Sequence, residues 1–151
     1  MEQKILYFDD EPGYVKSLIN NLELNHGWTA DKKGKIRFIS DPAEMIDEIN
    51  SSNLYDLFVL DIMIPSYGIE KKGIFNKEEI RRIDRDNNMG ILIAEKIRTI
   101  DKYKETPIIF VSAKGNNEIP DSIESPFGCV VKPTLARDLS KKMEEMLTQK
   151  N

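Results

Sequence analysis

The sequence predicts a single α/β domain in which helices cover both faces of a parallel β-sheet. Two observations support this prediction. The run Leu57 to Pro65 is apolar apart from a single carboxylate, and such runs are typical of strands buried on both faces. Before it, apolar strand-like segments alternate with segments of helical periodicity, which indicates a parallel sheet wound with helices. The 151 residues are enough for one such domain.

The composition is ordinary for a soluble globular protein, with 40% hydrophobic and 32% charged residues. The formal net charge of -4 argues against a general nucleic-acid or membrane-surface binder. The one cysteine, Cys129, excludes an internal disulfide and a cysteine-rich metal cluster, and it fits a reducing compartment. No apolar stretch approaches the ~20 residues of a membrane span, and the first residues do not resemble a signal peptide. We therefore expect a cytoplasmic protein.

The first expected strand, Lys4 to Phe8, leads directly into three acidic residues, Asp9, Asp10 and Glu11. Pro12 suits the first turn of the helix that follows, and its apolar residues recur at helical spacing. A helix N-terminus uses one acidic residue, or at most two, as a cap and dipole partner. Three adjacent carboxylates therefore exceed what capping requires.

The second expected strand is Lys35 to Ser40. Asp41, Pro42 and Glu44 then mark a helix start, with a cap, a proline in the first turn and an acidic third residue. The polar connection Asn25 to Lys35 precedes this strand and contains the only histidine, His26, which we expect in a loop without a catalytic role. The central strand follows, with Asp61 near its end.

The pattern breaks between residues 66 and 88, where charged residues outnumber apolar ones. Asn76 to Arg85 predicts one short helix, with Ile80 and Ile83 on one side. Connections of this length in compact domains tend to be functional lids or disordered segments. A specific role and a merely solvated insertion both remain open.

Beyond the insertion, the pattern of strands and helices resumes. We expect a helix over Gly90 to Ile100, a strand over Pro107 to Val111, and a strand over Gly128 to Val131. Gly115 to Phe127 contains two prolines, which leave room for about one turn of helix. Thr134 is expected to cap the last helix, whose apolar residues are Leu135, Leu139, Met143, Met146 and Leu147.

Polar residues follow four of the expected strands: Asp9 and Asp10, then Asp61, Ser112 and Lys132. The carboxyl ends of parallel strands meet at one edge of the sheet, where ligands bind. Each residue alone has a structural explanation; Asp61, for example, could merely begin a turn. Together the carboxylates repel one another by several kcal/mol at an effective dielectric of about 20, so cations must offset this repulsion. Lys132 and a divalent ion such as Mg²⁺ fit that need.

This arrangement predicts a site for an incoming phosphoryl group. Asp61 would act as the nucleophile, while the metal and Lys132 neutralise the phosphoryl oxygens and Ser112 offers a hydroxyl donor.

Four motifs carry a resemblance to a known family: Ile5 to Pro12 (ILYFDDEP), Val59 to Pro65 (VLDIMIP), Ile108 to Lys114 (IIFVSAK) and Val130 to Pro133 (VVKP). In this order they resemble the receiver domain of two-component response regulators. The resemblance covers nearly the whole chain outside residues 66–88. It implies a flavodoxin-like, doubly wound sheet of five parallel strands in the order 2-1-3-4-5, forming one domain over residues 1–151.

The resemblance also implies roles for individual residues. Asp61 would accept a phosphoryl group from a phosphohistidine on a sensor histidine kinase or a phosphotransfer protein. Asp10 and Asp61 would bind Mg²⁺ directly, Asp9 would bind it through water, and the backbone carbonyl of Met63 would complete the protein ligands. Ser112 would be the hydroxyl that moves to the phosphoryl oxygen.

Lys132 would pair with the phosphate, and the bond from Lys132 to Pro133 would be cis. A cis bond at this point turns the chain sharply and aims the lysine into the site.

Three features depart from the family pattern. About twenty residues are inserted between Pro65 and Gly90, beside the expected site. Cys129 stands three residues before the lysine, where many receivers carry an aromatic residue, and Phe127 would replace it only in a shifted register. The fourth helix of the family is short and interrupted by prolines. The last two departures place the usual switching and output surfaces in question.

The resulting hypothesis is a phosphorelay receiver whose own chemistry is limited to self-phosphorylation and slow autodephosphorylation. The sequence suggests either a stand-alone receiver with a downstream protein partner or a receiver cut from a protein with an effector domain, and a homodimer is possible. We expect no direct nucleic-acid or membrane contact.

Two alternatives remain. The first is a pseudo-receiver that serves only as a protein-interaction module. The second is a haloacid-dehalogenase-like phosphatase, which Met63 disfavours because that family needs an acid two residues after the nucleophile.

Overall fold

The computed structural model of the protein describes residues 2–64 and 73–149. Its centre is a five-stranded parallel sheet in the order β2-β1-β3-β4-β5, which confirms the predicted topology. The strands are β1 (Lys4–Phe8), β2 (Lys35–Ile39), β3 (Leu57–Asp61), β4 (Ile108–Ser112) and β5 (Phe127–Val131). The helices are α1 (Pro12–His26), α2 (Pro42–Ile49), α3 (Lys77–Asp86), α4 (Met89–Thr99) and α5 (Ala136–Gln149), with short 3-10 turns at η2 (Asp101–Tyr103) and η3 (Gly115–Glu118).

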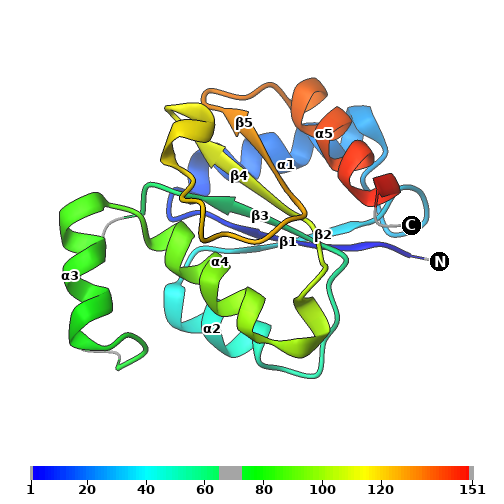
Figure 1. The fold of residues 1–151 in the computed structure, drawn as a ribbon. Coiled ribbons are helices and arrows are strands. Elements are labelled where there is room, and N and C mark those ends of the chain that lie inside the picture. Colours follow the sequence, from blue (N-terminus) through cyan, green and yellow to red (C-terminus); the bar gives the residue numbers. More distant parts are fainter. Residues whose placement is uncertain (1, 65–72, 150–151) are drawn as a thin grey trace.

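Two separate hydrophobic cores lie on the two faces of the sheet, because successive strand residues point to opposite sides. Helices α1 and α5 cover one face, where Tyr7 and Val59 belong to the buried cluster. Helices α2 and α4 cover the other face, where Phe8 and Leu60 are buried (Figure 1). Strand β3 is buried along its whole length, as its apolar sequence predicts. Among the described helices, none combines the length and hydrophobicity that a transmembrane segment needs.

Three local predictions are corrected. His26 lies in the last turn of α1 and not in a loop, because the helix continues to Gly27, which ends it in the left-handed conformation with φ 77°. Leu135 is 60% exposed and contributes nothing to the core. Thr134 lies two residues before the start of α5 at Ala136, and its hydroxyl donates to the Leu135 carbonyl instead of capping the helix (3.4 Å).

The described part of the insertion contains the predicted short helix, displaced by one residue, as α3. A capping box begins it: Asn76 Oδ1 accepts from the Glu79 backbone N–H at 2.8 Å, and the Glu79 carboxylate accepts from the Asn76 N–H at 2.9 Å. Ile83 is fully buried in the same core cluster as α4. The helix is thus part of the packed domain, and Figure 1 shows it beyond the carboxyl ends of the strands. Pro65 and residues 66–72 of the expected insertion lie outside the described residues.

The segment between β4 and β5 contains a single 3-10 turn, as the two prolines predict. A buried arginine, Arg98, fastens this segment to α4. Its guanidinium donates to the carbonyl oxygens of Tyr103 (2.8 Å), Thr106 (2.7 Å), Glu124 (3.0 Å) and Pro126 (2.8 Å). The planar guanidinium therefore joins the loop before β4 to the segment before β5.

We predict that Arg98→Lys lowers the free energy of unfolding by about 2–4 kcal/mol, because an ammonium group cannot satisfy four diverging buried carbonyls. Urea denaturation measures the change. Arg137→Lys, at an exposed position on α5, is the matched control and should stay within about 0.5 kcal/mol of the parent. Similar stabilities for the two variants would contradict the role assigned to Arg98.

Candidate functional site

The predicted carboxylates meet at the carboxyl edge of the sheet. Asp9 directly follows β1 and Asp61 ends β3, the strand that pairs with β1. Both residues are almost completely buried, whereas Asp10 reaches solvent. One carboxylate oxygen from each of the three residues lies within 4.8 Å of the others. The parallel pairing of β1 and β3 is what brings these side chains together.

Lys132 reaches into this cluster from the end of β5. Its Nζ lies 3.0 Å from Asp61 Oδ1 and 3.6 Å from Asp9 Oδ2. The peptide bond from Lys132 to Pro133 is cis, as the resemblance implied. The following residue is held to α1, because the Thr134 backbone N–H donates to the hydroxyl of Tyr14 at 3.3 Å. The sequence contains no signal that identifies this tyrosine contact.

Burial and mutual repulsion disfavour negative charge at the site. Burial, followed by the charge of Asp61, raises the pKa of Asp9 to about 6. Burial also raises the pKa of Asp61, although Lys132 partly offsets the effect. Burial alone would lower the pKa of Lys132, but the neighbouring carboxylates outweigh it and the pKa of the lysine is raised. Lys132 is therefore charged and paired, yet the cluster still lacks positive charge.

Ser112 is fully buried at the end of β4, one residue beyond the Val111 that pairs with Asp61. Its hydroxyl accepts a hydrogen bond from the Lys114 backbone N–H at 3.0 Å, and its carbonyl accepts from the Lys132 N–H at 2.9 Å. The strand ends of β3, β4 and β5 thus place Asp61, Ser112 and Lys132 on one edge, as predicted.

Met63 and Gly90 complete the surroundings of Asp61. A backbone hydrogen bond from Met63 reaches the Asp61 carboxylate and lowers its pKa, opposing the larger effect of burial. The side chain of Met63 is 41% exposed, and its carbonyl as a metal ligand stays a prediction. Gly90, at the start of α4, packs against the backbone of Asp61, and an added Cβ would lie 2.0 Å from the Asp61 carbonyl oxygen. A glycine is therefore required there for α4 to approach the site.

The residues present fit a hard divalent cation. Three carboxylates converge, and Asp9 Oδ2 is buried and accepts no hydrogen bond from any described residue. Such oxygen donors are the ligands that Mg²⁺ and similar ions prefer. A bound cation would supply the positive charge that Lys132 alone does not provide.

Phe127 does not replace the aromatic residue that is missing at Cys129. The register of β4 and β5 pairs Ser112 with Val131, four residues beyond Phe127. The ring of Phe127 packs edge-on against Phe110 in the core, with centroids 6.0 Å apart. Phe127 is therefore remote from the hydroxyl of Ser112, and the position three residues before the lysine is held by the half-buried Cys129.

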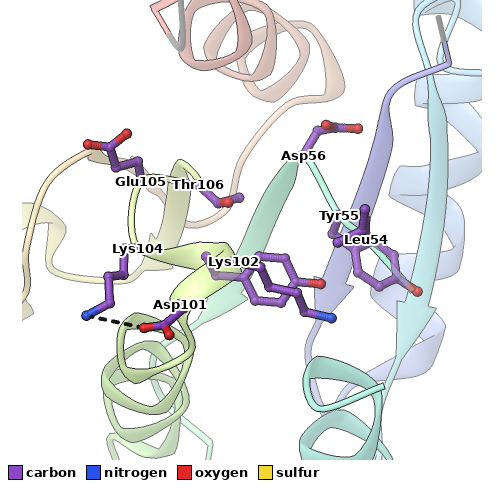
Figure 2. A pocket seen from close by; sticks show the side chains of 9 residues that line it. Leu54, Tyr55, Asp56, Asp101, Lys102, Lys104, Glu105 and Thr106 are labelled. Atoms are coloured by element: carbon purple, nitrogen blue, oxygen red, sulfur yellow. Dashed lines mark ion pairs between the residues drawn. The ribbon is translucent and has the colours of Figure 1, made fainter. Parts of the chain in front are cut away.

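A separate hollow of about 520 Å³ lies at the opposite edge, near the amino ends of β3 and β4. Figure 2 shows its mixed lining, with Lys104 paired to Asp101 at 3.7 Å and Asp56 across the opening. It contains none of the residues of the carboxylate cluster. The chemistry predicted from the sequence therefore lies elsewhere.

Comparison with known proteins assigns the fold. No protein-family model and no curated protein sequence matches the chain. A CheY-like response regulator receiver domain protein from Methanospirillum hungatei is 19% identical, with a TM-score of 0.65 over 99% of this chain and 97% of that one. The receiver domain of the Francisella response regulator 1452 is also 19% identical, with a TM-score of 0.63 over 99% of this chain and 100% of that one.

The N-terminal domain of a response regulator/sensory box/GGDEF 3-domain protein from Carboxydothermus hydrogenoformans is similar as well. It is 19% identical, with a TM-score of 0.65 over 97% of this chain and 95% of that one. The chain therefore has the CheY-like fold of response regulator receiver domains, and the match extends over nearly its whole length.

We predict that Asp9→Asn stabilises the metal-free protein by about 1–3 kcal/mol at pH 7, because the folded state raises the pKa of Asp9 to about 6. The ionised carboxylate costs stability above that pKa, and the cost disappears as the pH falls toward the ordinary value of 3.8. Urea denaturation in EDTA at pH 7 and pH 4 should show the gain only at the higher pH. The control Asp47→Asn, on the exposed side of α2, should change little at either pH.

Proposed function

We propose that the protein is a phosphorelay receiver that accepts a phosphoryl group on Asp61 from a phosphohistidine of a sensor kinase or phosphotransfer protein. The observation that best supports this is the buried Asp61 carboxylate, paired at 3.0 Å with Lys132 and flanked by Asp9 and Asp10. The receiver-domain fold places this group at the sheet edge where ligands bind. Three converging carboxylates with one lysine are suited to phosphoryl transfer with a divalent cation.

In the proposed step, a carboxylate oxygen of Asp61 attacks the phosphorus atom while the bond from phosphorus to the donor imidazole nitrogen breaks. The nitrogen keeps the bonding electron pair and takes up a proton, and an acyl phosphate forms on Asp61. Lys132 already lies at hydrogen-bonding distance from Asp61 Oδ1, so it can follow the new phosphoryl oxygen without a large movement.

We propose Mg²⁺ as the metal ion, held by Asp9, Asp10 and Asp61 with the Met63 carbonyl. When bound, it supplies positive charge that lowers the repulsion between the carboxylates and the phosphoryl oxygens. The Ser112 hydroxyl, which accepts one hydrogen bond from the Lys114 N–H, is the group that would move to the phosphoryl oxygen. The resulting shift of the loop after β4 would carry the signal to a downstream protein.

Slow loss of the phosphoryl group to water follows from the same site. The residue two positions after Asp61 is the apolar Met63, which cannot act as a general acid or base. The proposed activity is therefore that of a phosphoacceptor with slow autodephosphorylation, in a cytoplasmic two-component system, and not of a dedicated phosphatase.

We predict that incubation with Mg²⁺ and acetyl phosphate adds one phosphoryl group to the parent protein and none to Asp61→Asn, because only the carboxylate can form an acyl phosphate. Intact-mass spectrometry measures the gain. Asp101→Asn, at a 97% exposed aspartate on the opposite edge, is the control and should gain the group like the parent.

Equal uptake by Asp61→Asn would move the acceptor to another residue. No uptake by any of the three proteins, even with a phosphohistidine donor, would favour the pseudo-receiver, a protein-interaction module without phosphoryl chemistry.

A further inference from the structure

The insertion forms one wall of a second hollow, which opens at the same edge of the sheet as Asp61. Its volume is about 580 Å³, within the range of small-molecule sites. One side is formed by Ile62, the residue after Asp61, and another by Lys114 in the loop after Ser112. Helix α3 contributes Arg82 and Arg85. The hollow therefore lies beside residues that closely follow Asp61 and Ser112 in the chain.

The two arginines have different partners. Arg82 binds Glu95 of α4 through two hydrogen bonds of 3.2 and 3.3 Å, and both side chains are about 30% exposed, so this pair holds α3 in place. Arg85 is 68% exposed, and its guanidinium contacts the carboxylate of Asp86, the next residue in the chain. An exposed pair of this kind contributes little to stability. An incoming dianion can therefore replace Asp86 at Arg85 without loosening the helix.

The charge of the hollow complements that of the neighbouring cluster. Asp9, Asp10 and Asp61 repel any donor that carries a phosphate, and Lys132 is already paired with them. The described lining of the hollow carries three basic side chains and one carboxylate, and Glu95 pairs with Arg82 from outside the lining, which leaves one positive charge in excess. Its surface therefore attracts an anion at the edge where the acidic cluster would repel it.

One polar atom in the lining also lacks a partner. Asn88 is the residue before α4, yet its side chain makes no capping hydrogen bond. Its Oδ1 atom is buried and accepts no hydrogen bond from the described residues. The Nδ2 group of the same amide carries two N–H donors, from which a phosphate oxygen can accept.

We propose that the hollow binds a small phosphate-bearing donor of the acyl phosphate class, and that Arg85 is the residue that holds its anionic group before transfer. Helix α3 would thus serve as a donor-recognition element that the insertion adds to the receiver fold. This inference depends on the proposed function, because the bound donor is the substrate of the Asp61 site.

The test compares three proteins that differ only on α3: the parent, Arg85→Ala and Arg81→Ala. Arg81 carries the same charge on the same helix, is paired with Glu78 at 3.0 Å, and is not part of the lining. Initial rates of phosphoryl gain are measured against acetyl phosphate concentration. Arg85→Ala should raise the half-saturating concentration about fivefold or more while the maximal rate changes less than about twofold, and Arg81→Ala should match the parent.

Two further measurements separate binding from folding and general charge. Arg85→Lys retains the charge and should recover most of the lost affinity, which a misfolded helix would not allow. Raising the salt concentration should reduce the difference between parent and Arg85→Ala, because screening weakens exposed charges. Equal half-saturating concentrations for Arg85→Ala and Arg81→Ala would overturn the inference and leave Asp61 as the acceptor.

A binding measurement covers the case in which no phosphoryl group is gained. The Asp61→Asn protein is titrated with inorganic phosphate and followed by amide NMR. Shifts should concentrate at residues 82–88 and 114, persist when Arg81→Ala is added, and disappear when Arg85→Ala is added. If the parent is not phosphorylated, the proposed function fails. If phosphate then causes no Arg85-dependent shifts, the anion site fails independently.

Discussion

Three carboxylates are confined at one edge of a buried parallel sheet, and this constraint shapes the rest of the site. Two of them, Asp9 and Asp61, are almost completely shielded from water, and burial raises the pKa of each. Such a cluster is unfavourable in isolation, because neither hydration nor distance relieves the repulsion. The arrangement persists because the strands that carry it have large apolar cores on both faces of the sheet. The stability of the cores maintains a site that is itself electrostatically strained, and the proposed cation would relieve that strain.

The surroundings of the site are held by backbone contacts as much as by charge. Gly90 lets the start of α4 approach the Asp61 carbonyl, which no side chain would allow. On the other side, the hydroxyl of Tyr14 fixes the backbone after Pro133, so that Lys132 is directed at the carboxylates. These contacts keep Lys132 and Asp61 in register with each other. Preorganisation of this kind would reduce the rearrangement that the proposed transfer requires.

The two irregular segments of the chain are integrated by different means. Helix α3 is held on α4 by the buried Ile83 and by the ion pair of Arg82 with Glu95. The segment between β4 and β5 has only a single 3-10 turn, and Arg98 binds its backbone carbonyls directly. The first set of contacts places a helix near Asp61, and the second holds a segment that contains only a 3-10 turn. Both segments shape the surfaces around the site while the sheet stays regular.

The sequence by itself determined the five strands and the acidic and basic residues at their ends, because apolar runs and the residues that terminate them are local features. It also indicated the short α3 helix from the spacing of Ile80 and Ile83. Only the tertiary structure decided which partners these residues meet. The exposure of Leu135, the four carbonyls around Arg98 and the distance of Phe127 from Ser112 depend on strand register and on packing between segments far apart in the chain. Local patterns do not encode such pairings, since they arise only when the sheet is assembled.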